Sequence, residues 1–139
     1  MKFAIQKKTG LAVESLHALL VSGESVQSPE LASAIDTTTS FLPQIMSPLV
    51  QKGWVESKRG PNGGYRLVAD PESISVLDLI EAVEGETDTK TCVLKGGPCG
   101  GLEHCAFHEP WKAARTALLD ELASVPVLTL TRPQLDAIG

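Results

Sequence analysis

Residues 54–68 of this chain, WVESKRGPNGGYRLV, decide its fold. Two strand-like runs, 54–59 and 65–68, flank five residues of which three are glycine and one is proline. Glycine and proline between two such runs are typical of a turn, so the stretch predicts a β-hairpin with a flexible tip. Lys58 and Arg59 directly precede the glycines, where basic side chains can approach a phosphate backbone.

Helices are predicted before this hairpin, over residues 8–22, 29–35 and about 39–52. Gly23 ends the first, and Ser28 followed by Pro29 supplies a hydroxyl cap and a helix-compatible proline for the second. Asp36 and the three threonines after it favour a tight turn before the third, which Gly53 ends. A short helix, a turn and a longer helix form a helix-turn-helix, and the hairpin adds a wing.

The second half of the chain predicts two further helices. Residues 74–83 form one, with Ser75 as its cap and Gly85 as its end, and residues 109–123 form a long amphipathic one. The apolar stripe of that long helix needs a partner; it consists of Trp111, Ala114, Leu118, Leu119 and Leu122. We expect a mainly α fold with a small β-hairpin, divided into a winged helix-turn-helix DNA-binding domain over 1–85, a cysteine-rich loop over 86–108 and a helix with a C-terminal tail over 109–139.

The predicted recognition helix carries little charge, because no Lys or Arg occurs between Lys8 and Lys52. Base contacts must then come from neutral polar residues, and we expect Thr38, Thr39, Ser40 and Gln44 to make them. Phosphate contacts fall to Lys52 and to the hairpin, through Lys58, Arg59, Gly60, Asn62 and Gly63. The alternative is an ordinary helical bundle with a surface turn.

Charge and composition limit the classes of function. The net charge of −5 is unevenly spread: residues 1–69 hold seven Lys and Arg against five Asp and Glu, whereas residues 70–139 hold five against twelve. The basic excess, although small, falls on the predicted DNA-binding half. No apolar run approaches the roughly 20 residues of a membrane span. We expect a cytoplasmic protein that acts on DNA and takes no small-molecule substrate.

All three cysteines lie within fourteen residues, and with one histidine they form the pattern C-x6-C-x5-C-x2-H. The four candidate ligands are Cys92, Cys99, Cys105 and His108. An odd number of clustered cysteines does not suit a disulfide framework, whereas thiolates suit iron–sulfur clusters and zinc about equally. His104 competes with His108 as the fourth ligand. Redox-active thiols without a metal rank behind both metals, and a catalytic pair of Cys105 and His108 ranks last.

Together these motifs resemble the IscR/NsrR/RirA family of bacterial winged-helix transcription regulators. The resemblance covers about residues 7–123 and rests on the hairpin over 59–67, the helix over 77–85 and the cysteine pattern that ends near Trp111. It is closest to IscR-type members, with one extra residue between the first two cysteines. This chain differs from the family at Phe41 and Pro43 in the recognition helix, where members often have a tyrosine and an acid. The operator sequence of the family therefore cannot be assigned to this chain.

The resemblance implies a homodimer that binds a palindromic operator and is held by the long C-terminal helix of the region 109–139. It also implies an iron–sulfur cluster on Cys92, Cys99, Cys105 and His108, with 2Fe–2S preferred and 4Fe–4S possible. The protein would then be a repressor, and not an enzyme, and would use the cluster to sense cluster status, redox state, iron or nitric oxide. The main alternative is a zinc- or thiol-based regulator on the same scaffold. A small Cys/His enzyme and a winged helix used for protein contacts remain weaker alternatives.

Overall fold

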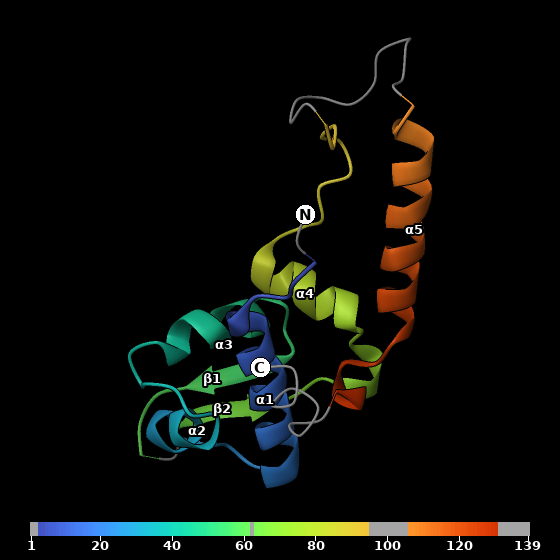
Figure 1. The fold of residues 1–139 in the computed structure, drawn as a ribbon. Helices are drawn as coiled ribbons and strands as arrows, with labels where there is room; N and C mark the ends of the chain where they lie inside the picture. Colours follow the sequence, from blue (N-terminus) through green and yellow to red (C-terminus); the bar gives the residue numbers. More distant parts are fainter. Residues whose placement is uncertain (1–2, 62, 95–105, 131–139) are drawn as a thin grey trace.

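The computed structural model of the chain describes residues 3–61, 63–94 and 106–130 (Figure 1). The elements in chain order are α1 (Lys7–Ser22), α2 (Ser28–Ala34), α3 (Leu42–Gln51), β1 (Val55–Lys58), β2 (Gly64–Leu67), η1 (Pro71–Ser73), α4 (Val76–Glu84), α5 (His108–Ser124) and η2 (Val127–Thr129). The predicted fold class is confirmed: the protein is mainly helical, with one antiparallel hairpin that follows a helix-turn-helix.

Local capping explains most of the helix boundaries. Gly23 ends α1 in the left-handed region, at φ 68°, and donates its N–H to the carbonyl oxygen of Leu19. The α4 helix begins with a complete capping box, in which the Ser75 hydroxyl accepts from the N–H of Asp78 and the Asp78 carboxylate accepts from the N–H of Ser75. These are signals that a single sequence carries, and both capping residues agree with the prediction, although α4 begins at Val76, two residues later than predicted.

The α3 helix begins three residues later than predicted. The hydroxyl of Thr38 accepts a hydrogen bond from the N–H of Phe41 at 3.2 Å and so closes a separate turn before the helix. The later start places Pro43 in the first turn, where its missing N–H costs no helical bond. Pro48 lies inside α3 and removes the N–H that would donate to the carbonyl of Gln44.

The hairpin gains a third extended segment from the connection between α1 and α2. In the hairpin itself Val55 pairs with Leu67, and the register continues to Lys58 opposite Gly64. Val26 then forms an isolated bridge with Tyr65, in which the two residues exchange two backbone hydrogen bonds of 2.8 Å each. This bridge attaches the wing to the segment that precedes α2, so the wing and the helix-turn-helix are held together by main-chain bonds.

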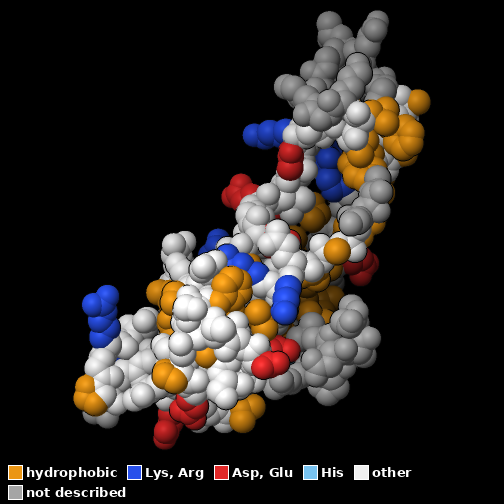
Figure 2. All heavy atoms as spheres, turned by 60° about the vertical axis from the view of Figure 1, so that its left-hand side comes forward, with side chains coloured by type: hydrophobic (Ala, Val, Ile, Leu, Met, Phe, Trp, Pro, Cys, Tyr) orange, Lys and Arg blue, Asp and Glu red, His pale blue; other side chains and the backbone are white. Residues whose placement is uncertain are grey.

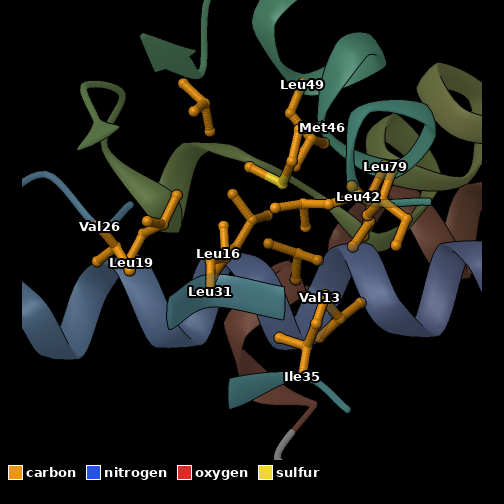
Figure 3. Close-up of a cluster of buried hydrophobic side chains, with 14 of the residues drawn as sticks. Val13, Leu16, Leu19, Val26, Leu31, Ile35, Leu42, Met46, Leu49 and Leu79 are labelled. Atoms are coloured by element: carbon orange, nitrogen blue, oxygen red, sulfur yellow. The ribbon is translucent and has the colours of Figure 1, made fainter. Parts of the chain in front are cut away.

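The core lies between α1, α2, α3, α4 and the hairpin, and Figure 3 shows buried side chains of the four helices converging there. Its fully buried members include Leu16, Leu31, Leu42, Met46 and Leu79. They come from four different helices, α1 to α4. Burial of so many large aliphatic side chains supplies the main stabilisation of the winged-helix body.

The α5 helix differs from the others because it extends away from the body (Figure 1), and none of its residues is buried. It packs against α4. Within the apolar stripe predicted for this helix, Trp111 is half-buried and Leu118 remains 43% exposed. One part of the stripe therefore faces the protein, and another part faces outward in the single chain.

After α5 the chain returns to the body. The N–H of Val76 donates to the carbonyl of Val125, and the N–H of Val127 donates to the carbonyl of Ile74, both at 2.8 Å. Val127 is completely buried in the same core as α1. The C-terminal end of α5 is thus attached to the core through the segment that follows it.

Candidate DNA-binding face and metal-binding loop

The outward face of α3 and the residues 38–40 that precede it are rich in neutral polar side chains. Ser40, Gln44 and Ser47 follow one another at helical spacing, and all three are exposed. Thr38 and Thr39 are exposed in the turn that precedes the helix. Side chains of this kind bind base edges by hydrogen bonds, and Gln is suited to adenine. Ser47 was not predicted, although its spacing from Gln44 and Ser40 already placed it on this face.

The hydroxyl of Thr38 has a structural task, because it accepts from the N–H of Phe41 and lies 3.1 Å from the Ser40 hydroxyl. It therefore caps the turn that leads into α3. Thr39 and Gln44 form no hydrogen bond through their side chains among the described residues, and their polar groups face solvent. The two are better placed than Thr38 to contact a base.

The wing presents Lys58, Arg59 and Gly60 on its exposed side. Across the strands, Arg66 is paired with Glu56 at 3.0 Å. Among the described residues Lys58 and Arg59 form no such ion pair, so their positive charge is not neutralised within the chain. Figure 1 shows the turn before α3 and the tip of the wing on the same side of the molecule, at the left of the view.

A groove of about 460 Å³ lies between the wing and the start of α2, with Ser28, Lys58 and Arg59 among its lining residues. The side-chain amide of Gln27 spans it and donates to the carbonyl oxygen of Pro61 at 2.8 Å. This contact joins the tip of the wing to the residue before α2. Sequence reasoning missed Gln27, because its partner lies thirty-four residues away.

Two glycines of the wing are required by packing within the protein. A Cβ on Gly63 would lie 2.4 Å from the carbonyl oxygen of Lys58, and one on Gly64 would lie 2.3 Å from that of Val26. Gly63 is also buried. We predicted that the glycines permit close approach to phosphate, but these two positions exclude a side chain because other backbone segments pass too close. Gly60, at φ 103° and in open space, keeps the freedom expected at an exposed tip. Asn62 lies outside the described residues.

Charge on this part of the molecule is dispersed. Figure 2 shows Lys and Arg side chains at separate points of the face it draws rather than in one block. Lys52, which we predicted to contact phosphate, is exposed at the C-terminal end of α3. Binding to a duplex would therefore depend on several single phosphate contacts and the neutral face of α3.

The candidate metal-binding loop is attached to α4 at its start. The N–H of Thr87 donates to the Glu81 carboxylate at 2.6 Å. The Asp88 carboxylate then accepts from the Thr91 hydroxyl and from the N–H groups of Lys90 and Thr91. These bonds, the Thr91 hydroxyl foremost, hold the pKa of Asp88 below its usual 3.8, with a smaller contribution from Arg115. The turn ends at Cys92, which is only 8% exposed.

Cys92 and His108 line one small cavity of about 50 Å³. Cys92 comes from the loop, whereas His108 is the first residue of α5, and its side chain is 18% exposed. The imidazole Nε2 lies 3.8 Å from a carboxylate oxygen of Glu109. The structure therefore brings together two of the four candidate ligands, which are sixteen positions apart in the sequence.

The other two candidate ligands, Cys99 and Cys105, and the competing His104 lie outside the described residues. Among the residues that the structure describes, no group of three or more His, Cys, Asp or Glu side chains is placed to hold a metal ion. The two described donors still suit an iron–sulfur cluster, because a thiolate and an imidazole are ligands of such centres and both line the same cavity. Lys112 and Arg115 of α5 line this space as well.

A much larger hollow, of about 860 Å³, lies between the N-terminal segment, α1, α4 and the segment after α5. Ile5, Leu11 and Ile80 are among its mainly apolar lining residues. Neither Cys92 nor His108 lines it. No helix in the described part of the chain is long and apolar enough to cross a membrane.

A winged helix-turn-helix with a long C-terminal helix and a cysteine-containing loop between them defines a class of transcriptional regulators. The chain belongs to the Rrf2 family: the family profile, described as an iron-dependent transcriptional regulator, matches residues 5–133. The predicted family resemblance is thus confirmed.

Relatives and solved structures agree with this assignment. The HTH-type transcriptional regulator IscR of Escherichia coli (strain K12 / DH10B) is 38% identical over 102 residues, which are 72% of this chain and 62% of the relative. CymR, the global cysteine regulator of B. subtilis, has a TM-score of 0.69 at 24% identity over 99% of each chain. IscR of T. potens has a TM-score of 0.68 at 20% identity and covers 99% of this chain and 89% of its own. These two structures share the fold.

Proposed function

We propose that this chain is a dimeric, cytoplasmic DNA-binding repressor that carries an iron–sulfur cluster, preferably 2Fe–2S, on Cys92, Cys99, Cys105 and His108. The observation that carries the proposal is that Cys92 and His108 line one small cavity, although one lies in a loop and the other begins a helix. Such convergence of a thiol and an imidazole is what a shared metal centre requires.

DNA binding is supported by the two exposed surfaces of the winged-helix body. In the proposed complex α3 enters the major groove with Thr39, Ser40 and Gln44 toward the bases, while Lys58 and Arg59 contact the phosphate backbone. The wing stays in place through the Val26–Tyr65 bridge and the Gln27 amide. A palindromic operator follows if two copies bind symmetrically.

Dimer formation is supported by α5. A helix of 17 residues with no buried side chain is poorly stabilised by its own chain, and Leu118 on its outer side is 43% exposed. A second copy of α5 packed along this side would bury that surface. We therefore assign residues 109–139 as the dimerisation helix with its tail, and residues 86–108 as the cluster-binding loop.

The hydrogen bonds of α4 connect the candidate centre with the DNA-binding body. Glu81 holds the start of the loop, and Glu84 accepts from the N–H of Gln6 at 3.3 Å and from the Thr9 hydroxyl at 2.5 Å. When bound, a cluster would supply a link between Cys92 and His108 that is sensitive to redox state, nitric oxide and iron supply. Loss of this link would release the start of α5 from the loop and so change the spacing of the two recognition helices in a dimer.

The first test is the ultraviolet–visible spectrum of the full chain purified without oxygen, with iron, acid-labile sulfide and zinc assayed in the same sample. Visible absorption with matching iron and sulfide supports the cluster, and Cys92→Ala should abolish it. A colourless protein rich in zinc would overturn the cluster in favour of a zinc regulator on the same scaffold. A protein that binds no metal even after anaerobic reconstitution would instead favour thiol-based sensing.

A second experiment tests the proposed DNA binding separately from the cluster. Binding of the reconstituted chain to duplexes selected from a random pool should enrich a palindromic sequence, and Gln44→Ala should weaken binding to it. If no sequence is enriched over random duplex at moderate salt, the role of α3 as a reader of bases would be wrong, whatever the metal content.

A further inference from the structure

One face of α5 combines a candidate ligand with two positive charges. His108, Lys112 and Arg115 are separated by four and three residues, a spacing that places them on one side of a helix. All three line the same small cavity, and Cys92 lines it from the opposite loop. The helix therefore presents two cationic side chains toward the space that the thiol and the imidazole enclose.

These two cations are not neutralised by partners in the described part of the chain, where neither Lys112 nor Arg115 forms an ion pair. Asp88 is near enough for Arg115 to influence its pKa, but its carboxylate oxygens already accept from Thr91 and from the N–H of Lys90. Like charges at positions i and i+3 repel each other on a helix. An anion in the cavity would remove this penalty.

We propose that Lys112 and Arg115 stabilise the negative charge of the iron–sulfur cluster held at Cys92 and His108, and thereby raise its reduction potential. The inference rests on the proposed function. A cluster with three thiolate ligands carries net negative charge, because thiolates and sulfides outweigh two ferric ions. One-electron reduction converts one ferric ion to ferrous and adds one negative charge, so nearby cations favour the reduced state.

Arg115 and Lys112 should differ in how far each raises the reduction potential of the cluster. Arg115 is half-buried beside Trp111, whereas Lys112 is exposed, and solvent screens an exposed charge more effectively. Lys90 provides a matched control, because it is an exposed cation in the same loop, two positions before Cys92, and does not line the cavity. Sequence reasoning did not identify Lys112 or Arg115, because their relation to Cys92 arises only when the loop packs on α5.

The test is an optical redox titration of the anaerobically reconstituted full chain, with dithionite as the electron donor and soluble mediators. At a fixed potential, Arg115→Gln should lower the ratio of reduced to oxidised cluster about threefold to tenfold, equivalent to a midpoint lower by about 30–60 mV. Lys112→Gln should give a smaller change in the same direction, and Lys90→Gln should leave the midpoint at the wild-type value. Higher salt should shrink the shifts.

Arg115→Lys separates charge from packing, because it keeps the cation and alters the shape; its midpoint should stay near that of the wild type. The proposal is overturned if Arg115→Gln and Lys90→Gln give the same midpoint at full iron and sulfide content, or if Arg115→Lys shifts as far as Arg115→Gln. A wild-type chain that binds zinc or no metal would overturn the proposed cofactor and this inference together, whereas a normal cluster with unshifted midpoints overturns this inference alone.

Discussion

Replacement of Gly64 by alanine should detach the wing from the rest of the DNA-binding body. The new Cβ would lie 2.3 Å from the carbonyl oxygen of Val26 and 2.6 Å from its carbonyl carbon. Both are backbone atoms, so no flexible side chain can move aside. Gly64 also has a φ of 118°, which residues with a side chain rarely adopt. The segment that precedes α2 must therefore move apart from strand β2.

The loss of stability follows from the bonds at this point. An unfavourable backbone conformation costs about 1–3 kcal/mol. Loss of the two 2.8 Å hydrogen bonds between Val26 and Tyr65 adds about 0.5–1.5 kcal/mol for each bond. We expect Gly64→Ala to lower the free energy of unfolding by about 2–6 kcal/mol. For a chain of this size this corresponds to a decrease in Tm of roughly 8–24 °C.

Gly53→Ala is the matched control, because Gly53 also has a positive φ, of 76°, but a Cβ there meets nothing within 4 Å. It should cost only about 1–2 kcal/mol, from the backbone conformation alone. Urea denaturation followed by circular dichroism measures both variants. If they lose the same stability within about 0.5 kcal/mol, the close approach of Gly64 to Val26 does not constrain the wing and the reasoning is wrong.

Three further predictions concern single contacts. Gln27→Ala removes one exposed hydrogen bond to the wing tip and should weaken operator binding about twofold to fivefold with little change in Tm; anisotropy titrations that show no change at low salt would contradict this. Arg59→Ala should weaken binding to operator and random duplex alike, and should make the slope of log affinity against log salt shallower by about one. Arg66→Ala is the control and should leave the slope unchanged, because the charge of Arg66 is already paired with Glu56. Equal slopes in the two variants would remove Arg59 from the interface. Because the pKa of Asp88 in the folded protein lies below 3.8, its carboxylate stabilises the loop at higher pH, and this effect is lost as pH falls through the lowered pKa. The amide NMR resonance of Thr91 should therefore move in this acidic range, and it should be displaced at neutral pH in Asp88→Asn. A resonance that stays constant in the acid titration would refute the hydrogen bond between Thr91 and Asp88.

Several structural features could be predicted from sequence because their causes are local. The capping box at Ser75 and the glycine stop at Gly23 act over three or four residues, and the structure contains both. The glycine-rich run over 60–64 likewise marked the hairpin. The start of α3 was misplaced because the Thr38 hydroxyl competes with the helix for the N–H of Phe41, and propensity alone does not decide which bond forms.

The candidate ligands also combine features that the sequence predicts with features that depend on tertiary packing. Their residue types and spacing pointed to a metal site, but the pairing of Cys92 with His108 depends on how the loop packs against α5. Contacts at long range, such as the Gln27 amide on Pro61, leave no signal in a single sequence, because each partner is an ordinary exposed residue there.

By itself the sequence determined the winged helix-turn-helix, its fold class and the candidate metal ligands, since periodicity, caps and soft-ligand chemistry are properties of neighbouring residues. Only the tertiary structure decided that Val127 returns to the core, that Gly64 lies against Val26, and that Arg115 faces the same cavity as Cys92. These relations arise from packing between segments far apart in the chain, where burial and steric exclusion, and not local preference, select the arrangement.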